Sequence, residues 1–486
     1  MIKKVLIANR GEIALRIMKT LRKMDIQSVA VYSEADRNAP FVLYADEAVL
    51  IGPPPSSESY LQAERIIEVA LDKKCDAIHP GYGFLSENAA FAQAVAEQGI
   101  IFIGPSPSAI AMMGSKLEAK VAAKAAGAPL VPGSDTPIND PAEAKRIAGQ
   151  IGYPVLLKAA AGGGGKGMRV VESENEFEEQ LERASSEALS SFGDDAVFIE
   201  KYVQNPRHIE IQILADKHGN AIHLNERECS IQRRHQKVIE EAPSAVLDDA
   251  LREIMGATAV KIAKACGYSN AGTVEFLVDS AGDYYFLEMN TRLQVEHPVT
   301  EWITGIDLVE EQIYIAEGQP LRYAQSDISI SGHAIELRVY AEDPANNFLP
   351  STGFLSRYRP PKGPGIRVDD GFREGMEVPV YYDPLLSKLI AFGSTRAQAI
   401  AKMKEAIARY EIEGIASTLD FGAFVIQHPA FESGKYDTRF IDKYYTAASI
   451  SDKDIAAIAV SILEIHNRKV QTIHHKSDTW QLSRNR

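Results

Sequence analysis

Between residues 288 and 296 the sequence EMNTRLQVE places a polar side chain capable of chemistry at every even position. These side chains are Glu288, Asn290, Arg292, Gln294 and Glu296. Since side chains alternate across a strand, one interpretation is an amphipathic strand with a solvated face. Carboxylate and amide oxygens, however, are also hard ligands of the kind that Mg²⁺ prefers. We therefore favour a metal-dependent site over a wet strand face.

The length of this row limits how it can be used. One continuous strand would separate its two ends by about 26 Å, at about 3.3 Å per residue, and a single reacting centre cannot use both ends. We therefore expect the strand to stop near Asn290 and the chain to fold along an elongated site. Metal ligands would lie at its start, with the pair Arg292 and Glu296 farther along.

A hairpin just before this row predicts a second carboxylate at the same place. The runs TVEFLV and DYYFLEMN flank a turn at 280–282. Antiparallel pairing would bring Glu275 beside Glu288, and two adjacent carboxylates repel unless a cation lies between them. We interpret Glu275, Glu288 and Asn290 as a Mg²⁺ site that also holds nucleotide phosphates. The alternative is that Glu275 points into a salt bridge.

Four adjacent glycines lie in the segment AAAGGGGKGMRVV at 159–171. From Gly162 onward the loop fits G-x-G-x-x-G, but that fingerprint must open a helix, and MRVV predicts a strand. The Gly-Lys pair also lacks the Ser or Thr of a Walker A loop. Glycine lets backbone N–H groups approach phosphates closely, and Lys158 and Lys166 flank the loop. We interpret it as a phosphate-covering lid; a plain mobile surface loop is the alternative.

Two further segments concentrate basic and histidine side chains. In RHIEIQIL the polar residues His208, Glu210 and Gln212 alternate with isoleucines. The segment SIQRRHQKVIEEAP predicts a strand with Arg233, His235 and Lys237 on one side. A solvated face and structural histidines are the ordinary interpretations. An acidic protein that handles an anion must still gather cations, so we interpret His235 and Lys237 as contacts to phosphate or a small oxyanion.

The elements that must position these residues begin with a βαβ pattern. A strand at 4–8, a helix at 11–24 and a strand at 28–33 predict a parallel sheet with helices on its faces. Ser115 and Glu118 form a capping-box pattern at the start of a further helix. We expect five parts: 1–114, 115–203, 204–330, 331–446 and a tail at 447–486 with one helix and a basic end.

Composition narrows the class of protein. The 486 residues are 45% hydrophobic and carry a net charge of −14, which argues against general nucleic-acid binding. The cysteines Cys75, Cys229 and Cys266 have no CxxC or metal-ligand spacing, so we expect a reduced, cytoplasmic protein. The first residues show no signal-peptide pattern, and no apolar run approaches the roughly 20 residues of a membrane span.

Five motifs together resemble the biotin carboxylase family of ATP-grasp ligases over roughly residues 1–446. They are ANRGEIALRI, HPGYGFLSEN, GGGGKGM, ERECSIQRRHQKVIEEAPS and EMNTRLQVEHPVTE. The resemblance implies an α/β and α+β fold. Its parts would be an N-terminal Rossmann-like α/β domain at 1–114, linker helices and an ATP-grasp lid at 115–203, an ATP-grasp core at 204–330 and a biotin carboxylase C-terminal domain at 331–446.

The family's reaction is carboxylation of biotin by bicarbonate through carboxyphosphate, with ATP and Mg²⁺ or Mn²⁺. By resemblance the nucleotide-binding residues are Lys116, Lys158, Gly164, Gly165, Glu200, Lys201, Tyr202, Val203, His208, Gln232, His235, Glu275 and Glu288. Gly164 and Gly165 would lie over the phosphates, and 200–203 would be a hinge at the adenine edge. Glu275, Glu288 and Asn290 match the family's metal ligands.

The remaining matches concern the second substrate pair. The bicarbonate- and biotin-binding residues are Lys237, Arg292, Gln294, Val295 and Arg338, with Val295 acting through its backbone. The catalytic residues are Glu296, Arg292, Arg338 and Lys237. Glu296 would be the general base that removes the bicarbonate proton, and Arg338 would stabilise the biotin anion. Every matched position is present, so we expect an active enzyme.

The resemblance also implies partners. AKMKEA at 401–406 is not the Met-Lys-Met biotinylation signature and predicts an ordinary amphipathic helix. We therefore expect a separate biotin carboxyl carrier protein and a separate carboxyltransferase subunit, and the resemblance by itself implies a homodimer. The segment 428–445 resembles the acyl-CoA and pyruvate carboxylase branches of the family. We expect an acyl-CoA (acetyl- or propionyl-CoA) carboxylase of fatty acid metabolism, with a pyruvate carboxylase subunit as the alternative. The tail is either a docking segment for a partner or a solubilising extension.

Two other classes of function compete with this one. The chain could be another ATP-grasp ligase that joins a carboxylate to an amine, or a non-catalytic, ATP-binding regulatory subunit. The combination of Arg292, Glu296 and Arg338 favours biotin carboxylation, because an amide ligase has no need to stabilise a biotin anion.

Overall fold

A five-stranded parallel sheet forms the N-terminal part of the computed structural model, which describes residues 1–134, 136–159, 168–234 and 236–446. Its strands are all parallel, as the βαβ pattern predicts, and their order is β3-β2-β1-β4-β5. The strands are β1 (Lys4–Ile7), β2 (Gln27–Ser33), β3 (Glu47–Gly52), β4 (Ala77–His79) and β5 (Ile101–Phe102). The helices are α1 (Gly11–Lys23), α2 (Pro40–Tyr44), α3 (Ala63–Asp72), α4 (Ala89–Glu97) and α5 (Pro107–Gly114).

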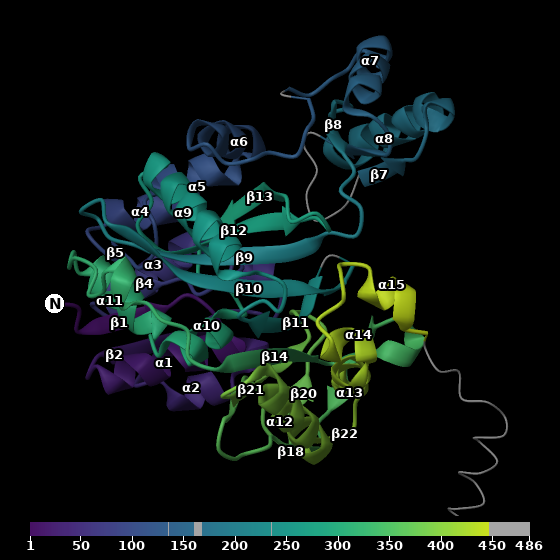
Figure 1. Cartoon of the computed structure of the whole chain (residues 1–486). Coiled ribbons are helices and arrows are strands. Elements are labelled where there is room, and N and C mark those ends of the chain that lie inside the picture. The colour runs from purple at the N-terminus through teal and green to yellow at the C-terminus, as the bar shows by residue number, and fades with distance from the viewer. Residues whose placement is uncertain (135, 160–167, 235, 447–486) are drawn as a thin grey trace, which may run out of the picture.

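A small three-stranded module stands apart from the rest of the molecule (Figure 1). Its antiparallel strands, in the order β7-β6-β8, are β6 (Val155–Ala159), β7 (Met168–Val171) and β8 (Val197–Lys201). Helices α7 (Pro141–Ile151) and α8 (Phe177–Phe192) belong to it, and α6 (Lys116–Ala125) precedes it. The glycine segment thus links two paired strands, as predicted, although 160–167 itself lies outside the described residues.

An eight-stranded sheet forms the centre of the molecule and carries most of the predicted site. Its order is β13-β12-β9-β10-β11-β14-β21-β19. The strands are β9 (Arg207–Ala215), β10 (Ala221–Arg233), β11 (Gln236–Ala242), β12 (Asn270–Val278), β13 (Tyr284–Asn290), β14 (His333–Tyr340), β19 (Ile366–Asp370) and β21 (Leu385–Gly393). The helices beside it are α9 (Asp249–Ala265), α10 (His297–Thr304) and α11 (Leu308–Ala316). The sheet is continuous across residue 330, so the strands before and after it share one backbone hydrogen-bond network.

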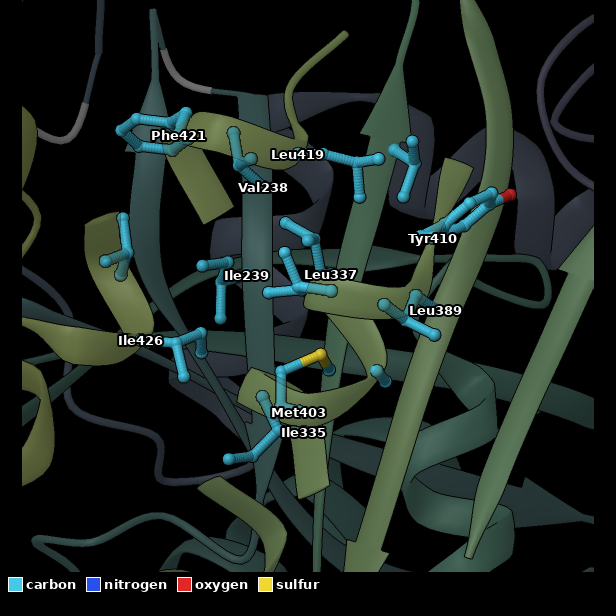
Figure 2. Close-up of a cluster of buried hydrophobic side chains, with 14 of the residues drawn as sticks. Val238, Ile239, Ile335, Leu337, Leu389, Met403, Tyr410, Leu419, Phe421 and Ile426 are labelled. Atoms are coloured by element: carbon cyan, nitrogen blue, oxygen red, sulfur yellow. The ribbon is translucent and has the colours of Figure 1, made fainter. Parts of the chain in front are cut away.

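The C-terminal core packs helices against one face of this sheet (Figure 2). Ile239, Ile335 and Leu389 from three adjacent strands meet Met403 and Ile426 from two helices. The helices are α12 (Arg396–Arg409), α13 (Leu419–Gln427), α14 (Pro429–Glu432) and α15 (Phe440–Tyr444). Short strands complete this part: β15 (Glu342–Asp343), β16 (Leu349–Pro350), β17 (Gly353–Phe354), β18 (Arg357–Arg359), β20 (Glu377–Val378) and β22 (Glu411–Glu413).

Several local predictions are confirmed. AKMKEA lies within α12, where Met403 is fully buried and the Lys404 ammonium pairs with Glu432. The Ser115 hydroxyl accepts from the Glu118 N–H, so Ser115 is the N-cap of α6. Its own N–H donates to the Ala111 carbonyl, so we find the cap without the reciprocal bond of a capping box.

One strand prediction is wrong. The segment SIQRRHQKVIEEAP is not a single strand with Arg233 and Lys237 on one side. It forms a hairpin that turns at Arg234, whose φ is +49°, and pairs Gln232 with Lys237. Alternation in sequence does not reveal this turn, because a left-handed residue without glycine leaves little trace in composition. His235 and the tail at 447–486 lie outside the described residues.

In the described part of the chain no helix is both long and apolar enough to cross a membrane.

Candidate active site

The hairpin β12–β13 places two carboxylates side by side, as predicted. Glu275 and Glu288 are direct partners in the antiparallel register, so both side chains lie on the same face. Glu275 is buried and Glu288 is at the open edge. The neighbouring Glu275 charge, followed by burial, raises the pKa of Glu288. Such a pair favours a bound cation, because each carboxylate destabilises the other's charge.

Glu275 also takes part in salt bridges, which was the alternative interpretation. Its Oε1 accepts from Lys237 Nζ at 2.7 Å, and its Oε2 lies 2.8 Å from His208 Nε2. Burial by itself raises the pKa of Glu275, but Lys237 and His208 lower it well below its ordinary value. Both interpretations therefore hold: Glu275 is an ionised partner of Lys237 and also faces Glu288.

The row 288–296 folds more tightly than expected. The strand ends at Asn290, as predicted, but the amide of Asn290 and that of Gln294 beyond it both turn onto one oxygen. Asn290 Nδ2 and Gln294 Nε2 donate to Glu275 Oε1 at 2.9 and 3.0 Å. The expected elongated site is therefore wrong: metal-type ligands and the Glu296 end converge, because the buried Glu275 carboxylate needs several donors.

The Asn290 amide limits how the predicted metal ligands fit. Its carbonyl oxygen accepts from Arg292 Nη2 at 3.0 Å, while its nitrogen donates to Glu275. Glu275 and Glu288 present the hard oxygens that suit Mg²⁺. Asn290 would complete the set only after its side-chain amide turns away from Arg292.

Glu296 lies at the centre of the charged cluster. It is the residue immediately before α10 and is buried. Its two oxygens accept from different cations: Oε1 from Lys237 Nζ at 2.8 Å and Oε2 from Arg338 Nη2 at 2.9 Å. Burial by itself raises the pKa of Glu296, but Lys237 and Arg338 lower it below its ordinary value. Glu296 is therefore an ionised carboxylate, ready to accept a proton from a ligand that displaces one of these cations.

Arg338 and Arg292 approach the cluster from different elements. Arg338, on β14, also donates from Nε to Glu240 Oε1 at 2.6 Å. Arg292 donates from Nε to Glu87 Oε2 at 2.8 Å. The Val295 carbonyl accepts from the fully buried Lys388 at 2.9 Å, which fixes the backbone between Gln294 and Glu296.

Three lysines, Lys116, Lys120 and Lys158, lie between the three-stranded module and Glu288. Lys158, on β6, and Lys120 both pair with the buried Glu200 carboxylate on β8. At the first residue of α6, burial and then the Lys158 charge lower the pKa of Lys116, whereas Glu288 raises it. Lys116 is thus near both Lys158 and Glu288, where nucleotide phosphates could bridge the two parts.

The other predicted nucleotide contacts are placed as follows. Lys201 Nζ donates to the Gly152 carbonyl, the Tyr202 N–H donates to the Pro154 carbonyl, and Val203 is half-buried just beyond the end of β8. Gln232 Nε2 lies 2.8 Å from His208 Nδ1, so these two form one contact pair. Gly164, Gly165 and His235 lie outside the described residues.

Sequence reasoning missed the buried guanidinium of Arg227, which organises this site. It donates to Gln212 Oε1 at 2.6 Å, Thr300 Oγ1 at 3.0 Å, Thr273 Oγ1 at 3.1 Å and Gln294 Oε1 at 3.0 Å, and it pairs with Glu210. Lys237 also pairs with Glu210. The alternation of Glu210 and Gln212 with isoleucines was the available signal. The solvated-face interpretation of that strand is wrong, because both side chains are fully buried.

Replacing Glu288 by glutamine is expected to raise the Mg²⁺ concentration for half-maximal turnover by about tenfold or more, since even outer partners of metal sites typically contribute 10–100-fold. The substitution keeps the side-chain shape and removes one of the two facing charges. Mg²⁺ titration of ADP release would measure it. The matched control is Glu182→Gln, an exposed carboxylate on α8. An unchanged Mg²⁺ requirement in Glu288→Gln would contradict the metal assignment.

Three family models match the chain. They are the biotin carboxylase N-terminal domain at residues 1–110, the ATP-binding domain of the carbamoyl-phosphate synthase L chain at 115–324 and the biotin carboxylase C-terminal domain at 336–443. Together they span most of the described residues.

Relatives and solved structures agree with these matches. A pyruvate carboxylase subunit of Methanothermobacter thermautotrophicus is 54% identical over 91% of this chain and 90% of its own length. The mitochondrial propionyl-CoA carboxylase alpha chain of Sus scrofa is 51% identical over 99% of this chain and 68% of its own length. A similar structure is the biotin carboxylase domain dimer of Hydrogenobacter thermophilus 2-oxoglutarate carboxylase, with MgADP, ADP and bicarbonate. Its TM-score is 0.87 at 50% identity, covering 91% of this chain and 98% of that one.

Proposed function

The chain belongs to the biotin carboxylase family of ATP-grasp ligases, and from this premise we propose that it is the biotin carboxylase subunit of an acyl-CoA carboxylase. Members of this family are ATP-dependent ligases. The observation that carries the biotin carboxylation part of this proposal is the shared position of Glu296, whose two oxygens lie within 3 Å of Lys237 and Arg338. The Glu296 carboxylate thus contacts both an ammonium that can bind phosphate, that of Lys237, and a guanidinium that can stabilise an oxyanion, that of Arg338.

The proposed reaction begins with bicarbonate in the corner formed by Arg292, Gln294 and the Val295 backbone. Glu296 takes the bicarbonate proton, and the freed oxygen attacks the γ-phosphate of ATP while the bond to the ADP oxygen breaks. Glu275 and Glu288 would hold Mg²⁺, which would supply charge neutralisation for the nucleotide phosphates. Lys237 would bind the phosphate as it is transferred. Its ammonium contacts Glu275 of the metal site, Glu296 of the bicarbonate site and Glu210, so it lies between the two sites.

The second step carboxylates biotin. Carboxyphosphate releases CO₂ and phosphate, and the phosphate removes the proton from the ureido nitrogen of biotin. That nitrogen then forms the new bond to the CO₂ carbon. Arg338 would hold the negative charge that develops on the ureido oxygen, since its planar guanidinium is fixed by Glu240 and Glu296 in a buried site.

Two observations favour an acyl-CoA acceptor. The matches to the propionyl-CoA carboxylase chains of pig, mouse and Ruegeria pomeroyi cover 99%, 98% and 96% of this chain, whereas those to the human and rat chains and to the archaeal pyruvate carboxylase subunit each cover 91%. The segment 428–445 resembles the acyl-CoA and pyruvate carboxylase branches, and we take it to favour the acyl-CoA branch. The alternative is a pyruvate carboxylase subunit, which the same relatives keep open; a further ATP-grasp amide ligase is the more distant alternative.

Partners and location follow as proposals. Biotin would arrive on a carrier whose attachment segment is not in this sequence, because AKMKEA is part of the packed helix α12. A carboxyltransferase would then use the carboxybiotin. We also propose a homodimer, since the similar 2-oxoglutarate carboxylase domain is a dimer, and a cytoplasmic location, since Cys75, Cys229 and Cys266 are free thiols.

One assay separates the classes of function. ADP release is measured with Mg²⁺ and bicarbonate, with and without free biotin. A biotin-stimulated rate is the expected result. Turnover that needs an amine and ignores biotin would favour an amide ligase, and no turnover would favour a regulatory subunit. The acceptor is identified with the complex purified from native cells and labelled bicarbonate. The labelled carboxyl group should appear on propionyl-CoA or acetyl-CoA; its appearance on pyruvate alone would contradict the acyl-CoA proposal.

A further inference from the structure

Two glutamates face each other in the sheet directly beside Arg338. Glu240 on β11 and Glu336 on β14 are direct partners in the antiparallel register, and both are 0% exposed. Such partners have Cβ atoms about 4.5–5.5 Å apart and point to the same face. Arg338 follows Glu336 by two residues on β14, so it shares that face. The proposed function gives neither glutamate a role.

The hydrogen bonds of this pair are unequal. Glu240 Oε1 accepts from Arg338 Nε at 2.6 Å, whereas Glu240 Oε2 and both oxygens of Glu336 have no hydrogen-bond partner among the described residues. Buried polar atoms are rarely left in this state, since each lost hydrogen bond is costly. A proton held between the two carboxyl groups would turn one of them into a donor and satisfy the other.

The surrounding charges cannot neutralise two ionised carboxylates at this place. The charged or titratable groups that face the pair are Arg338, Tyr340, Lys388, Lys237, Glu296 and Glu210. Arg338 and Lys237 are shared with Glu296, and the Lys388 ammonium is engaged by the Val295 carbonyl and by Glu12 at 3.2 Å. Burial raises the pKa of Glu240 to about 7, although Arg338 opposes this, and burial raises that of Glu336 well above its ordinary value.

We propose that Glu240 and Glu336 are positioning residues for Arg338 and that they hold one proton between them. The ionised Glu240 accepts a hydrogen bond from Arg338 Nε and Glu296 accepts one from Nη2, so the plane of the guanidinium is fixed from two sides. Because Glu336 is neutral, it adds no second negative charge beside the hydrogen bond between Arg338 and Glu240. The orienting role rests on the proposed function of Arg338, whereas the shared proton does not.

The first test uses Glu240→Gln, which keeps the shape and removes the charge. Biotin-stimulated turnover should fall by about 10–100-fold, by analogy with the loss when a partner that orients a metal ligand is removed. Biotin-independent ADP release should fall much less, because Glu296 and the metal ligands are untouched. The control is Glu311→Gln, another buried carboxylate that accepts from an arginine, Arg322, at 2.8 Å, where both rates should change together.

An equal loss of both rates in Glu240→Gln, or no loss in either, would overturn the orienting role. If the native protein shows no biotin stimulation at all, the proposed function fails instead, and the two failures are distinguishable. The shared proton is then tested without substrate, by thermal unfolding as a function of pH.

The sign of the pH effect follows from the proton. In the unfolded chain Glu336 releases its proton near the ordinary glutamate pKa of about 4.3, whereas in the folded state it keeps that proton to higher pH. The folded state therefore binds more protons than the unfolded state and loses stability as pH rises. Glu336→Gln cannot ionise and mimics the neutral acid. Its melting temperature should therefore fall less than that of the native protein between pH 5 and pH 8. If the melting temperatures of the two proteins change with pH by the same amount over this range, the shared proton is refuted.

Discussion

Replacing Glu296 by alanine is expected to lower biotin-dependent turnover by about 10²–10⁴-fold, the usual contribution of a general base, while ATP still binds. Glu296 is the ionised carboxylate between Lys237 and Arg338, and no other described carboxylate accepts hydrogen bonds from both cations. Without it bicarbonate keeps its proton and attacks the γ-phosphate poorly. ADP release measures the loss, and nucleotide titration by calorimetry measures the retained binding.

Two further variants sharpen this result. Glu296→Gln keeps the shape without the base and should fail nearly as badly, which separates proton transfer from packing. Glu301→Gln removes another buried carboxylate, on the helix α10 that Glu296 precedes. Glu301 accepts from Arg16 at 2.7 Å, and the variant should keep far more activity. Near-native turnover in Glu296→Gln would refute the base assignment.

Replacing Arg338 by glutamine is expected to lower biotin-stimulated turnover by about 10²–10³-fold, the usual loss when one preorganised donor to a developing oxyanion is removed. Biotin-independent ADP release should fall far less, since bicarbonate activation uses Glu296 and Arg292. Measuring both rates on one preparation shows the split. Arg338→Lys keeps the charge but not the planar fork, so it should restore only part of the rate.

A control for Arg338 is available on α12, the helix that packs against the same sheet. Arg396→Gln removes a guanidinium that pairs with the buried Glu241 at 2.7 Å, away from Glu296. It should lower stability without changing the ratio of the two rates. If Arg338→Gln lowers both rates equally, its role is structural and the assignment to the biotin anion fails.

Most of the fold could be predicted because its signals are local. The βαβ pattern, the hairpin around 280–282 and the helical character of AKMKEA depend on hydrophobic period and turn residues, which act over a few positions. The hairpin at Arg234 was missed since its turn has no glycine. The continuity of the large sheet across residue 330 depends on pairing of β11 with β14, about 90 residues apart in sequence, for which local pattern carries no signal.

The candidate site divides in the same way. The residue types in 288–296 and the facing pair Glu275 and Glu288 were accessible from spacing, because antiparallel register follows from the turn. The elongated layout was wrong, and Arg227 was missed. A fully buried arginine among polar strands looks in sequence like a solvated one, since its role depends on which acids the fold brings to it.

The sequence by itself determined which chemistry this protein can do: two facing carboxylates for a metal, a base, and basic residues for anions, each set by residue type at short spacing. Only the tertiary structure decided that Lys237 joins Glu275 to Glu296 and that Arg338 lies between Glu296 and Glu240. The physical reason is that charge interactions in a buried site depend on distances between strands and loops far apart in the chain, and these distances exist only once the sheet has formed.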